Sequence, residues 1–520
     1  MSQLSLLDLC REGNSEGALD LLKHPETCKI DRVNEDGDTA LIWACRNTMM
    51  EVALELLKYP TECKIDWVND DGDTALILAC SNGMKEVALE LLKYPTECKI
   101  DRVNDDGDTA LISACYKGMK KVALELLKHP TECKIDQFNT SGNTALLWAC
   151  IQDMKDVALE LLKYPNECKI DQVNKCGDTA LTWACSNDMK EVALELLKYP
   201  DNCKIDKVNG YDSTSLICAC SKGMKEVALE LLKYPNECKI DQVNKCGDTA
   251  LIWACIRNMR YVASELLKYP NECKIDQVNK CGDTALIWAC SNDMKEVALE
   301  LLKYPDNCKI DQVNGSDSTA LIYACANGMK EVALELLKYP NECKIDQVDK
   351  CGDTALIWAC MKDMNEVVLE LLKYPNECKI DQVNSKGNTA LSYAYKNNMP
   401  EIASIIENYA DFGEMLKLTH HHKIFLQKYI DRKTTEQINQ LPNKEEIQER
   451  QKKLSEIKDK VKKISKGGTC LVCLGETNNN TVFIKCKHVL HICDECMCVV
   501  DKKCPVCATT NEFITGCFAI

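Results

Sequence analysis

One unit of this chain reads Asn69-Asp-Asp-Gly-Asp-Thr-Ala-Leu-Ile-Leu-Ala-Cys-Ser-Asn-Gly-Met-Lys-Glu-Val-Ala-Leu-Glu-Leu-Leu-Lys-Tyr-Pro-Thr-Glu-Cys-Lys-Ile-Asp-Arg-Val103, and near copies of it fill most of the sequence. The opening Asn-x-x-Gly is typical of a turn in which Gly72 takes a positive φ. Asp73-Thr74 then begins a short helix, which an Asn-Gly pair ends. A second helix has apolar residues at helical spacing and ends at Pro95. The segment 98–103 is predicted to be extended and to lead into the next turn.

The unit recurs with a period of 35 residues, and a threonine at one position marks eleven copies: Thr39, Thr74, Thr109, Thr144, Thr179, Thr214, Thr249, Thr284, Thr319, Thr354 and Thr389. Residues 4–25 are similar to one more unit without its leading turn, which predicts an N-terminal cap. The last unit has Tyr395 in place of a repeated cysteine and Pro400 at the start of its second helix, which suits a C-terminal cap. Because such repeats pack only on their neighbours, the sequence predicts an all-α solenoid.

The phrase Gly-x-Thr-Ala-Leu-Ile-x-Ala-Cys stands where ankyrin repeats have Gly-x-Thr-Pro-Leu-His-x-Ala-Ala, so the array resembles the ankyrin-repeat family. The period exceeds the usual length of about 33 residues, and the extra residues fit best in the Tyr-Pro-x-x-Cys connector after the second helix. The resemblance covers residues 1–410 and implies a surface that binds a protein partner through hairpin tips and first-helix ends.

Two units depart from the pattern at the hairpin tip. Asp212 and Asp317 stand where the other units have glycine, and glycine appears instead at Gly210 and Gly315. Because aspartate tolerates the left-handed region better than most residues, we expect altered tips there rather than broken units.

The chain carries a net charge of −16 and has a pI of about 5.1, which argues against nucleic-acid binding because phosphate contacts need a basic face. The N-terminus shows no secretory signal, and no uncharged stretch approaches transmembrane length. No membrane partner is therefore expected.

Of the 36 cysteines, eleven recur in the register of Cys28 and eleven in the register of Cys45. Equivalent residues of stacked helical units lie about 8–10 Å apart, whereas a disulfide needs Cα atoms within about 7 Å. These cysteines are therefore interpreted as small buried apolar residues of a protein in a reducing compartment, cytoplasmic or nuclear.

Charge along the hairpin tips changes sign. Acidic pairs occur at Glu35-Asp36, Asp70-Asp71 and Asp105-Asp106, and the later tips carry Lys-Cys pairs at Lys175, Lys245, Lys280 and Lys350. We hypothesise that the acidic tips face basic residues of a partner, so that charge reversal at Asp70, Asp71, Asp105 and Asp106 weakens binding. A solvated face without a partner is the alternative.

Six tryptophans share one position in the first helix: Trp43, Trp148, Trp183, Trp253, Trp288 and Trp358. Packing between repeats is the favoured interpretation, and a ladder that stacks ligands is the alternative. The tip cysteines are explained by duplication of units, with metal binding as the alternative.

Residues 411–466 are predicted to be a helical connector. Ile447, Leu454, Ile457, Val461 and Ile464 have the spacing of a short coiled coil, or of a helix packed on the array. The triplet His420-His421-His422 has no carboxylate or cysteine beside it and is interpreted as polar surface.

Eight zinc-type ligands follow in residues 467–520: Cys470, Cys473, Cys486, His488, Cys493, Cys496, Cys504 and Cys507. Pairs of cysteines two residues apart let two thiolates reach one tetrahedral Zn²⁺, so this set predicts two structural zinc ions. So few apolar residues cannot form a sufficient core, and metal binding should therefore supply the folding energy.

The ligand order resembles the RING finger, and the resemblance implies interleaved sites. One zinc would take Cys470, Cys473, Cys493 and Cys496, and the other would take Cys486, His488, Cys504 and Cys507. Four residues separate His488 from the next cysteine, more than that family usually has, so His491 stays an alternative to His488.

RING fingers of ubiquitin ligases bind a ubiquitin-conjugating enzyme on an apolar groove, whose positions match Val472, Val500 and Pro505. Active members often have arginine after the last ligand, where this chain has Ala508. The tail, with Phe518 third from the end, is similar to the tails of dimeric RINGs, where an aromatic reaches across the homodimer. An ordinary closing strand is the alternative for the tail.

These patterns predict a ubiquitin ligase in which the array holds a protein target and the RING holds a conjugating enzyme. A non-enzymatic adaptor, whose zinc module only dimerises or binds protein, is the alternative, and a long spacer without a target is another. The organisation also resembles ankyrin proteins of large DNA viruses, which implies action inside a host cell.

Overall fold

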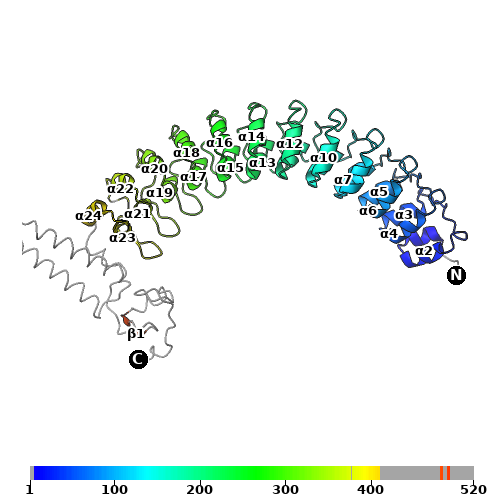
Figure 1. Cartoon of the computed structure of the whole chain (residues 1–520), viewed down its shortest axis with the longest axis horizontal. Coiled ribbons are helices and arrows are strands. Elements are labelled where there is room, and N and C mark those ends of the chain that lie inside the picture. The colour runs from blue at the N-terminus through cyan, green and yellow to red at the C-terminus, as the bar shows by residue number, and fades with distance from the viewer. Residues whose placement is uncertain (1–4, 376, 410–480, 484–488, 492–520) are drawn as a thin grey trace, which may run out of the picture. The chain divides into compact units, whose positions relative to one another are not determined.

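The computed structural model describes residues 5–375, 377–409, 481–483 and 489–491. The described chain falls into two compact units, one up to Cys308 and one from Lys309 onward. In each unit, short helices follow one another in pairs (Figure 1).

In the unit up to Cys308, the first helices of the pairs are α1 (Leu6–Arg11), α3 (Ala40–Arg46), α5 (Ala75–Ser81), α7 (Ala110–Tyr116), α9 (Ala145–Ile151), α11 (Ala180–Ser186), α13 (Ser215–Lys222), α15 (Ala250–Ile256) and α17 (Ala285–Ser291). The second helices are α2 (Ser15–Leu22), α4 (Met50–Leu56), α6 (Lys85–Leu91), α8 (Lys120–Leu126), α10 (Lys155–Leu161), α12 (Lys190–Leu196), α14 (Lys225–Leu231), α16 (Arg260–Leu266) and α18 (Lys295–Leu301). Each helix packs on the corresponding helix of the next pair, so the unit has two parallel rows of helices.

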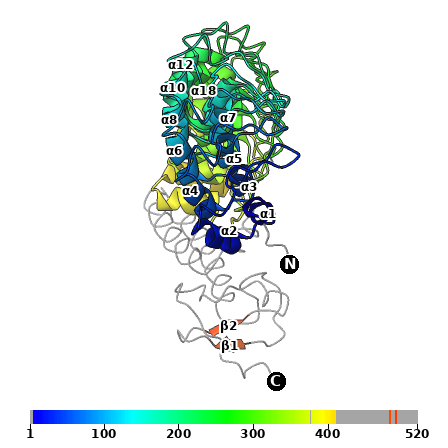
Figure 2. The same ribbon diagram turned by 90° about the vertical axis from the view of Figure 1, so that its right-hand side faces the viewer.

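The unit from Lys309 onward repeats this arrangement with α19 (Ala320–Ala326), α20 (Lys330–Leu336), α21 (Ala355–Met361), α22 (Asn365–Leu371), α23 (Ala390–Lys396) and α24 (Pro400–Tyr409). It also contains β1 (Thr481–Phe483) and β2 (Val489–His491), which pair antiparallel and lie side by side in Figure 2. The first helix pair of the array is α1 and α2, and the last second helix, α24, begins at Pro400. The assignment of residues 4–25 as an N-terminal cap stays a prediction.

The repeated threonine explains where each first helix begins. The Thr249 hydroxyl oxygen accepts a hydrogen bond from the Ile252 backbone N–H at 3.2 Å, and the same N-cap bond recurs at the other marker threonines. An N-cap of this kind satisfies one of the four backbone donors that a helix start leaves unpaired. The second helices are held by their core residues, and Val227, Ala228 and Leu231 of α14 are fully buried.

Side-chain amides join successive pairs at the ends of the first helices. Asn187, which follows α11, donates from Nδ2 to the carbonyl oxygens of Cys150 and Ile151 in α9 at 2.9 and 3.0 Å. Carbonyls in the last turn of a helix lack partners within the helix. The asparagine therefore caps the C-terminus of the preceding repeat, so this first-helix end serves packing rather than partner binding.

Asn187→Ala is expected to lower the free energy of unfolding by about 1–2 kcal/mol, because two carbonyls lose their donor. Asn292→Ala should match it, since Asn292 donates to Cys255 and Ile256 at 2.9 and 3.1 Å. Gln152→Ala should cost less, because Gln152 has one such bond, to the Tyr116 carbonyl. Urea unfolding of the full chain, followed by circular dichroism, measures all three, and equal midpoints for Asn187→Ala and wild type would contradict the capping role.

The prediction of an extended segment at 98–103 was wrong for its first half. The Cys98 backbone N–H donates to the Tyr94 carbonyl at 2.9 Å, and Lys99 has a φ of 52°. The connector therefore curls into turns, in which Cys98 and Ile100 are buried and Lys99 between them is half-buried. The same left-handed lysine recurs in every full connector from Lys64 to Lys379. The length of the connector provides the physical reason, since a curled backbone takes up its extra residues without separating the repeats.

The tips with Asp212 and Asp317 keep the ordinary turn. The expectation of an altered tip backbone was therefore wrong, whereas the expectation that the units stay intact was right. Asp212 has a φ of 58°, and its N–H donates to the Asn209 carbonyl at 2.9 Å, as Gly72 does to Asn69 at 3.0 Å. The link to the next tip differs. Ser213 replaces the usual aspartate acceptor, and in the described part of the chain no bond joins it to Asn244.

No helix in the described residues is both long enough and apolar enough to cross a bilayer. The predicted connector 411–466 and its boundaries lie outside the described residues and stay predictions.

Candidate functional site

The acidic tips predicted from the sequence lie on one face with the C-terminal ends of the first helices. Asp36, Asp70, Asp71, Asp105 and Asp106 are all exposed. Between the first two of these tips lies a cation of the chain itself, the guanidinium of Arg46. Arg46, at the end of α3, places Nη2 3.7 Å from Asp38 Oδ1, 3.2 Å from Asp71 Oδ2 and 3.6 Å from Asp73 Oδ2.

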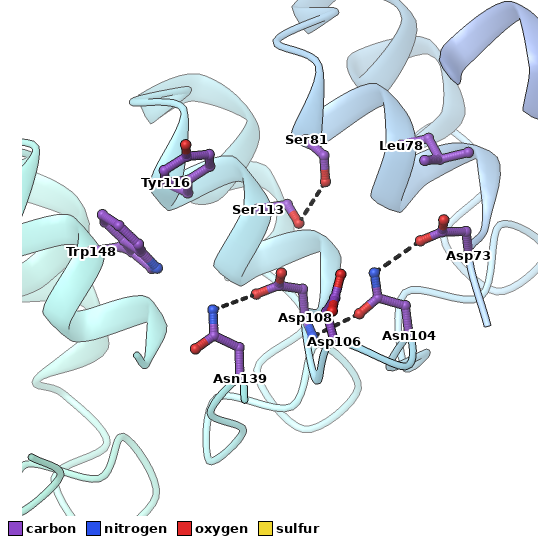
Figure 3. A pocket seen from close by; sticks show the side chains of 10 residues that line it. All are labelled: Asp73, Leu78, Ser81, Asn104, Asp106, Asp108, Ser113, Tyr116, Asn139 and Trp148. Carbon is purple, nitrogen blue, oxygen red and sulfur yellow. Dashed lines mark hydrogen bonds between the residues drawn. The ribbon is translucent and has the colours of Figure 1, made fainter. Parts of the chain in front are cut away.

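One repeat further along, the same face opens into a pocket of about 340 Å³ (Figure 3). That volume is near the lower end of the range for small-molecule sites. Its lining residues come from α5, α7, α9 and the adjoining tips: Asp73, Leu78, Ser81, Asn104, Asp106, Asp108, Ser113, Tyr116, Asn139 and Trp148. This lining contains three carboxylates and no lysine or arginine.

The pocket exists because the tryptophan series is interrupted. Trp43 and Trp148 bracket two units that have Leu78 and Ser113 at the same position. Both smaller side chains are buried at the floor, and Trp148 with Tyr116 forms a wall in which the ring centroids are 4.7 Å apart at 64°. The other full units have tryptophan or tyrosine at this position, except the unit with Cys218, and the pocket lies where two successive units have smaller side chains.

Hydrogen bonds within the array hold the carboxylates of the pocket in place. Asn104 donates from Nδ2 to Asp73 Oδ1 at 2.9 Å, and Asn139 donates to Asp108 Oδ1 at 3.0 Å (Figure 3). Each asparagine oxygen also accepts a backbone N–H of its own tip, so the amide is fully oriented. The carboxylates of Asp73 and Asp108 are thus oriented by the fold before any partner arrives, while Asp106 is exposed at the rim.

The electrostatics of the pocket favour a positive guest. Burial raises the pKa of Asp108, the Asn139 hydrogen bond opposes the rise, and the neighbouring Asp106 and Asp73 add to it. Burial also raises the pKa of Asp73, and there both Asn104 and the Arg46 guanidinium act in the lowering direction. Charge repulsion among these carboxylates would be relieved by a cation, since an opposite charge favours the ionised form.

The six tryptophans of the series are half-buried, and the packing interpretation stays a prediction. In the described residues, the buried Nε1 atoms of Trp43, Trp183, Trp253 and Trp288 have no hydrogen-bond partner. Trp358 differs because Asp349 stands where the other units have asparagine, and Trp358 Nε1 donates to its Oδ2 at 3.3 Å.

No disulfide joins cysteines within the described residues. Nearly all are buried, and burial raises the pKa of the Cys168 thiol to about 12. The tip cysteines Cys176, Cys246, Cys281 and Cys351 are exposed. Within the described residues, no three histidine, cysteine, aspartate or glutamate side chains gather as a metal site would require.

Thiol alkylation at pH 8 should therefore separate Cys176 from Cys168 in the native protein. The thiolate is the reactive form, and a pKa near 12 instead of 9.0 leaves about a thousandfold less thiolate at Cys168. Peptide mapping by mass spectrometry after a short pulse should find Cys176 modified and Cys168 intact, with both modified in denaturant. Equal native labelling of the two would contradict the burial of the connector cysteines.

The eight predicted zinc ligands, together with Val472, Val500, Pro505 and Phe518, lie outside the described residues. In the sequence, β1 precedes Cys486 and His488, and β2 follows them. His491, the alternative ligand, is in β2 and pairs with Thr481. The zinc assignment therefore stays a prediction.

Comparison with known families identifies the array. A family model described as "Ankyrin repeats (3 copies)" matches residues 6–103, 90–172, 154–242, 228–314, 251–347 and 321–415. These overlapping matches cover well over half of the chain, so the protein belongs to the ankyrin-repeat family. The repeats indicate a role in protein–protein interaction. A search of curated proteins gave no significant match.

Proposed function

We propose that this protein is a RING-type ubiquitin ligase whose ankyrin array recruits a protein target. The observation that carries the proposal is the order of eight zinc-type ligands from Cys470 to Cys507, which follows a family-assigned binding array in one chain. A long binding surface joined to a compact zinc module suits an enzyme that brings two other proteins together.

The donor set fits two structural zinc ions. Seven thiolates and one imidazole provide four ligands for each ion, so neither ion keeps an open position for water or substrate. When bound, zinc would supply the folding energy of a module that has few apolar residues. Its role would be to shape the module, and the chemistry of transfer would belong to the proteins that the module holds.

In the proposed reaction, a lysine amine of the target attacks the thioester between ubiquitin and the conjugating enzyme. The C–N bond of the isopeptide forms and the C–S bond breaks, releasing the enzyme thiol. Val472, Val500 and Pro505 would contact the conjugating enzyme, and Phe518 would contact the enzyme held by the partner copy of a homodimer. The chain would contribute rate by positioning alone.

Self-ubiquitination of the purified full chain tests the proposal directly. The chain is incubated with ubiquitin, its activating enzyme, ATP and a panel of conjugating enzymes, and products are followed by immunoblot. Modified forms should appear with at least one conjugating enzyme. A chain that binds zinc and dimerises but forms no product with any of them would favour the adaptor, a reading that Ala508 supports because it lacks the arginine common after the last ligand.

Removal of Phe518-Ala519-Ile520 should abolish ubiquitin transfer while the chain keeps two zinc ions. The reason is that the aromatic would act across the dimer and would not hold metal. Elemental analysis measures zinc in the same preparation that is assayed for transfer. Retained transfer would sink the proposed role of the tail without affecting the zinc assignment.

We also propose that the protein acts in the reducing cytoplasm or nucleus, because buried unpaired cysteines suit such a compartment. The resemblance to ankyrin proteins of large DNA viruses implies that this compartment belongs to a host cell.

A further inference from the structure

The repeat places two equivalent sets of three carboxylates side by side on the face that carries the tips. The first set is Asp38, Asp71 and Asp73, and the second is Asp73, Asp106 and Asp108, each position shifted by 35 residues. In the fourth unit the pattern ends, because Ser141 and Asn143 replace the two acids. The array therefore presents this arrangement twice in succession.

The first set holds a guanidinium that belongs to the chain. Arg46 contacts all three carboxylates within 3.7 Å, and its Cζ lies 5.0 Å from the centroid of the Trp43 ring. A planar guanidinium with five donors is suited to several carboxylates at once. The protein thus shows within itself which chemical group this arrangement binds.

The second set lacks that cation. Ser81 stands at the position of Arg46, and its hydroxyl donates to the Ser113 hydroxyl at 3.0 Å instead of reaching the carboxylates. In the described residues, neither Asp106 nor Asp108 has an ion pair with a cationic side chain. Lys117, which directly follows α7, places its Nζ 5.0 Å from the centre of the Tyr116 ring. The pocket of Figure 3 therefore has the shape and charge of an arginine site without the arginine.

We propose that this pocket binds the arginine side chain of a protein partner, with the guanidinium between Asp73, Asp106 and Asp108. Its aliphatic stem would lie over Leu78 and Ser113, beside the wall that Tyr116 and Trp148 form. The inference rests on the proposed role of the array as the target-recruiting surface and deepens it to one residue type.

Arginine is favoured over lysine by geometry. Asp73 Oδ1 accepts from Asn104 and its Oδ2 lies 3.6 Å from Arg46 Nη2, while Asp108 Oδ1 accepts from Asn139. Asp106 and Asp108 are therefore the main acceptors for a guest, and in the described residues the carboxylates do not converge on one point as a metal site would require. A single ammonium is a compact charge, whereas the forked guanidinium can bridge separated oxygens. The distances of Arg46 to its three carboxylates illustrate this bridging.

The test uses the full chain labelled with 5-fluorotryptophan, with L-argininamide as the probe. Fluorine NMR gives one resonance for each of the seven tryptophans, and Trp148→Phe assigns the resonance at the pocket. Argininamide should shift the Trp148 resonance saturably, and citrullinamide, which has a similar shape without charge, should bind at least tenfold more weakly. An unresponsive Trp148 resonance, or equal binding of the two amides, would overturn the proposal.

Two variants act as matched controls on the same titration. Ser81→Arg should supply the missing cation from within the chain, as Arg46 does one repeat earlier, and abolish the response of Trp148. Arg46→Ser should empty the first set, so that argininamide now shifts the Trp43 resonance as well. If Ser81→Arg leaves the titration unchanged while circular dichroism shows an intact array, the probe binds elsewhere and the assignment is wrong.

A further variant tests whether an arginine of the same chain fills the pocket. Beyond residue 410 the sequence has two arginines, Arg432 and Arg450. A Trp148 resonance that responds only after both are replaced by glutamine would mean that the chain fills its own pocket, and the partner proposal would fall. The titration needs neither the zinc module nor a conjugating enzyme. Failure of the ligase proposal in the self-ubiquitination assay is therefore distinguishable from failure of the arginine site.

Discussion

Cys470→Ser is expected to lose self-ubiquitination completely, because serine cannot replace a thiolate in a structural zinc site. Apparent binding free energies of structural Zn²⁺ in small zinc modules are about 10–16 kcal/mol, and this free energy drives folding. Loss of one ligand should therefore release a zinc ion and unfold the proposed module. The array should be unaffected, since its helices are held by their own core.

Three measurements on the same preparation check this expectation. Elemental analysis should give two zinc ions for wild type and fewer for Cys470→Ser, circular dichroism should show unchanged helix content, and the ubiquitin assay should show no product. Cys498→Ser is the matched control, because Cys498 has no place in the ligand spacing. Wild type without zinc, or an active Cys470→Ser variant, would refute the zinc module and the ligase that depends on it.

Gly107→Val should be among the most damaging single changes in the array. Gly107 has a φ of 80°, and a Cβ there would meet the backbone Cα of Asn139 in the next tip at 2.9 Å. A left-handed β-branched residue costs about 1–3 kcal/mol, and forcing atoms into a packed site costs about 1–3 kcal/mol more. The free energy of unfolding should therefore fall by roughly 2–6 kcal/mol, with fragment-resolved hydrogen exchange rising first in the two tips involved.

Two controls separate the causes of this loss. Gly107→Asp should cost less than valine, since Asp212 and Asp317 occupy the equivalent position with a φ of 58°. Gly83→Val isolates the backbone term, because Gly83 also has a positive φ of 73° but no atom lies within 4 Å of its added Cβ. Equal losses at Gly83 and Gly107 would show that the approach of neighbouring tips has no energetic weight.

Much of the fold was predictable from local sequence signals that the structure confirms. Thr249 and its equivalents mark the helix starts, Gly72 marks the turns, and Pro400 begins the last helix. The connector was less accessible, because nothing in the lysine side chain signals that Lys99 takes a left-handed conformation. Cys98 and Ile100, the two residues beside Lys99, are both buried, and the backbone of Lys99 must turn to bury both. Their burial is a matter of tertiary packing.

The candidate site was only partly predictable. The acidic tips were predictable from charge alone, whereas the first-helix ends were predicted only as a group to bind a partner. At two of those ends, Arg46 and Asn187 instead bind their own chain. A signal for the pocket was present in the sequence, since Leu78 and Ser113 interrupt the tryptophan series and Ser81 replaces Arg46. Interpreting that signal required knowledge of which positions of adjacent repeats meet.

The amino-acid sequence alone was enough to establish the repeat length, the helix starts and the membership of the ankyrin-repeat family. It could do so because turns, helix caps and apolar spacing each depend on only a few neighbouring residues. The zinc prediction likewise depends only on the sequence, because it uses the ligand residue types and their spacing within a short segment. Tertiary contact decided which acids face an internal arginine, which face an open pocket, and how each connector curls. Those outcomes depend on groups from different repeats, such as Arg46 and Asp73, which are 27 residues apart, or Asn187 and Cys150, which are 37 residues apart. Only stacking of the repeats brings such groups within bonding distance.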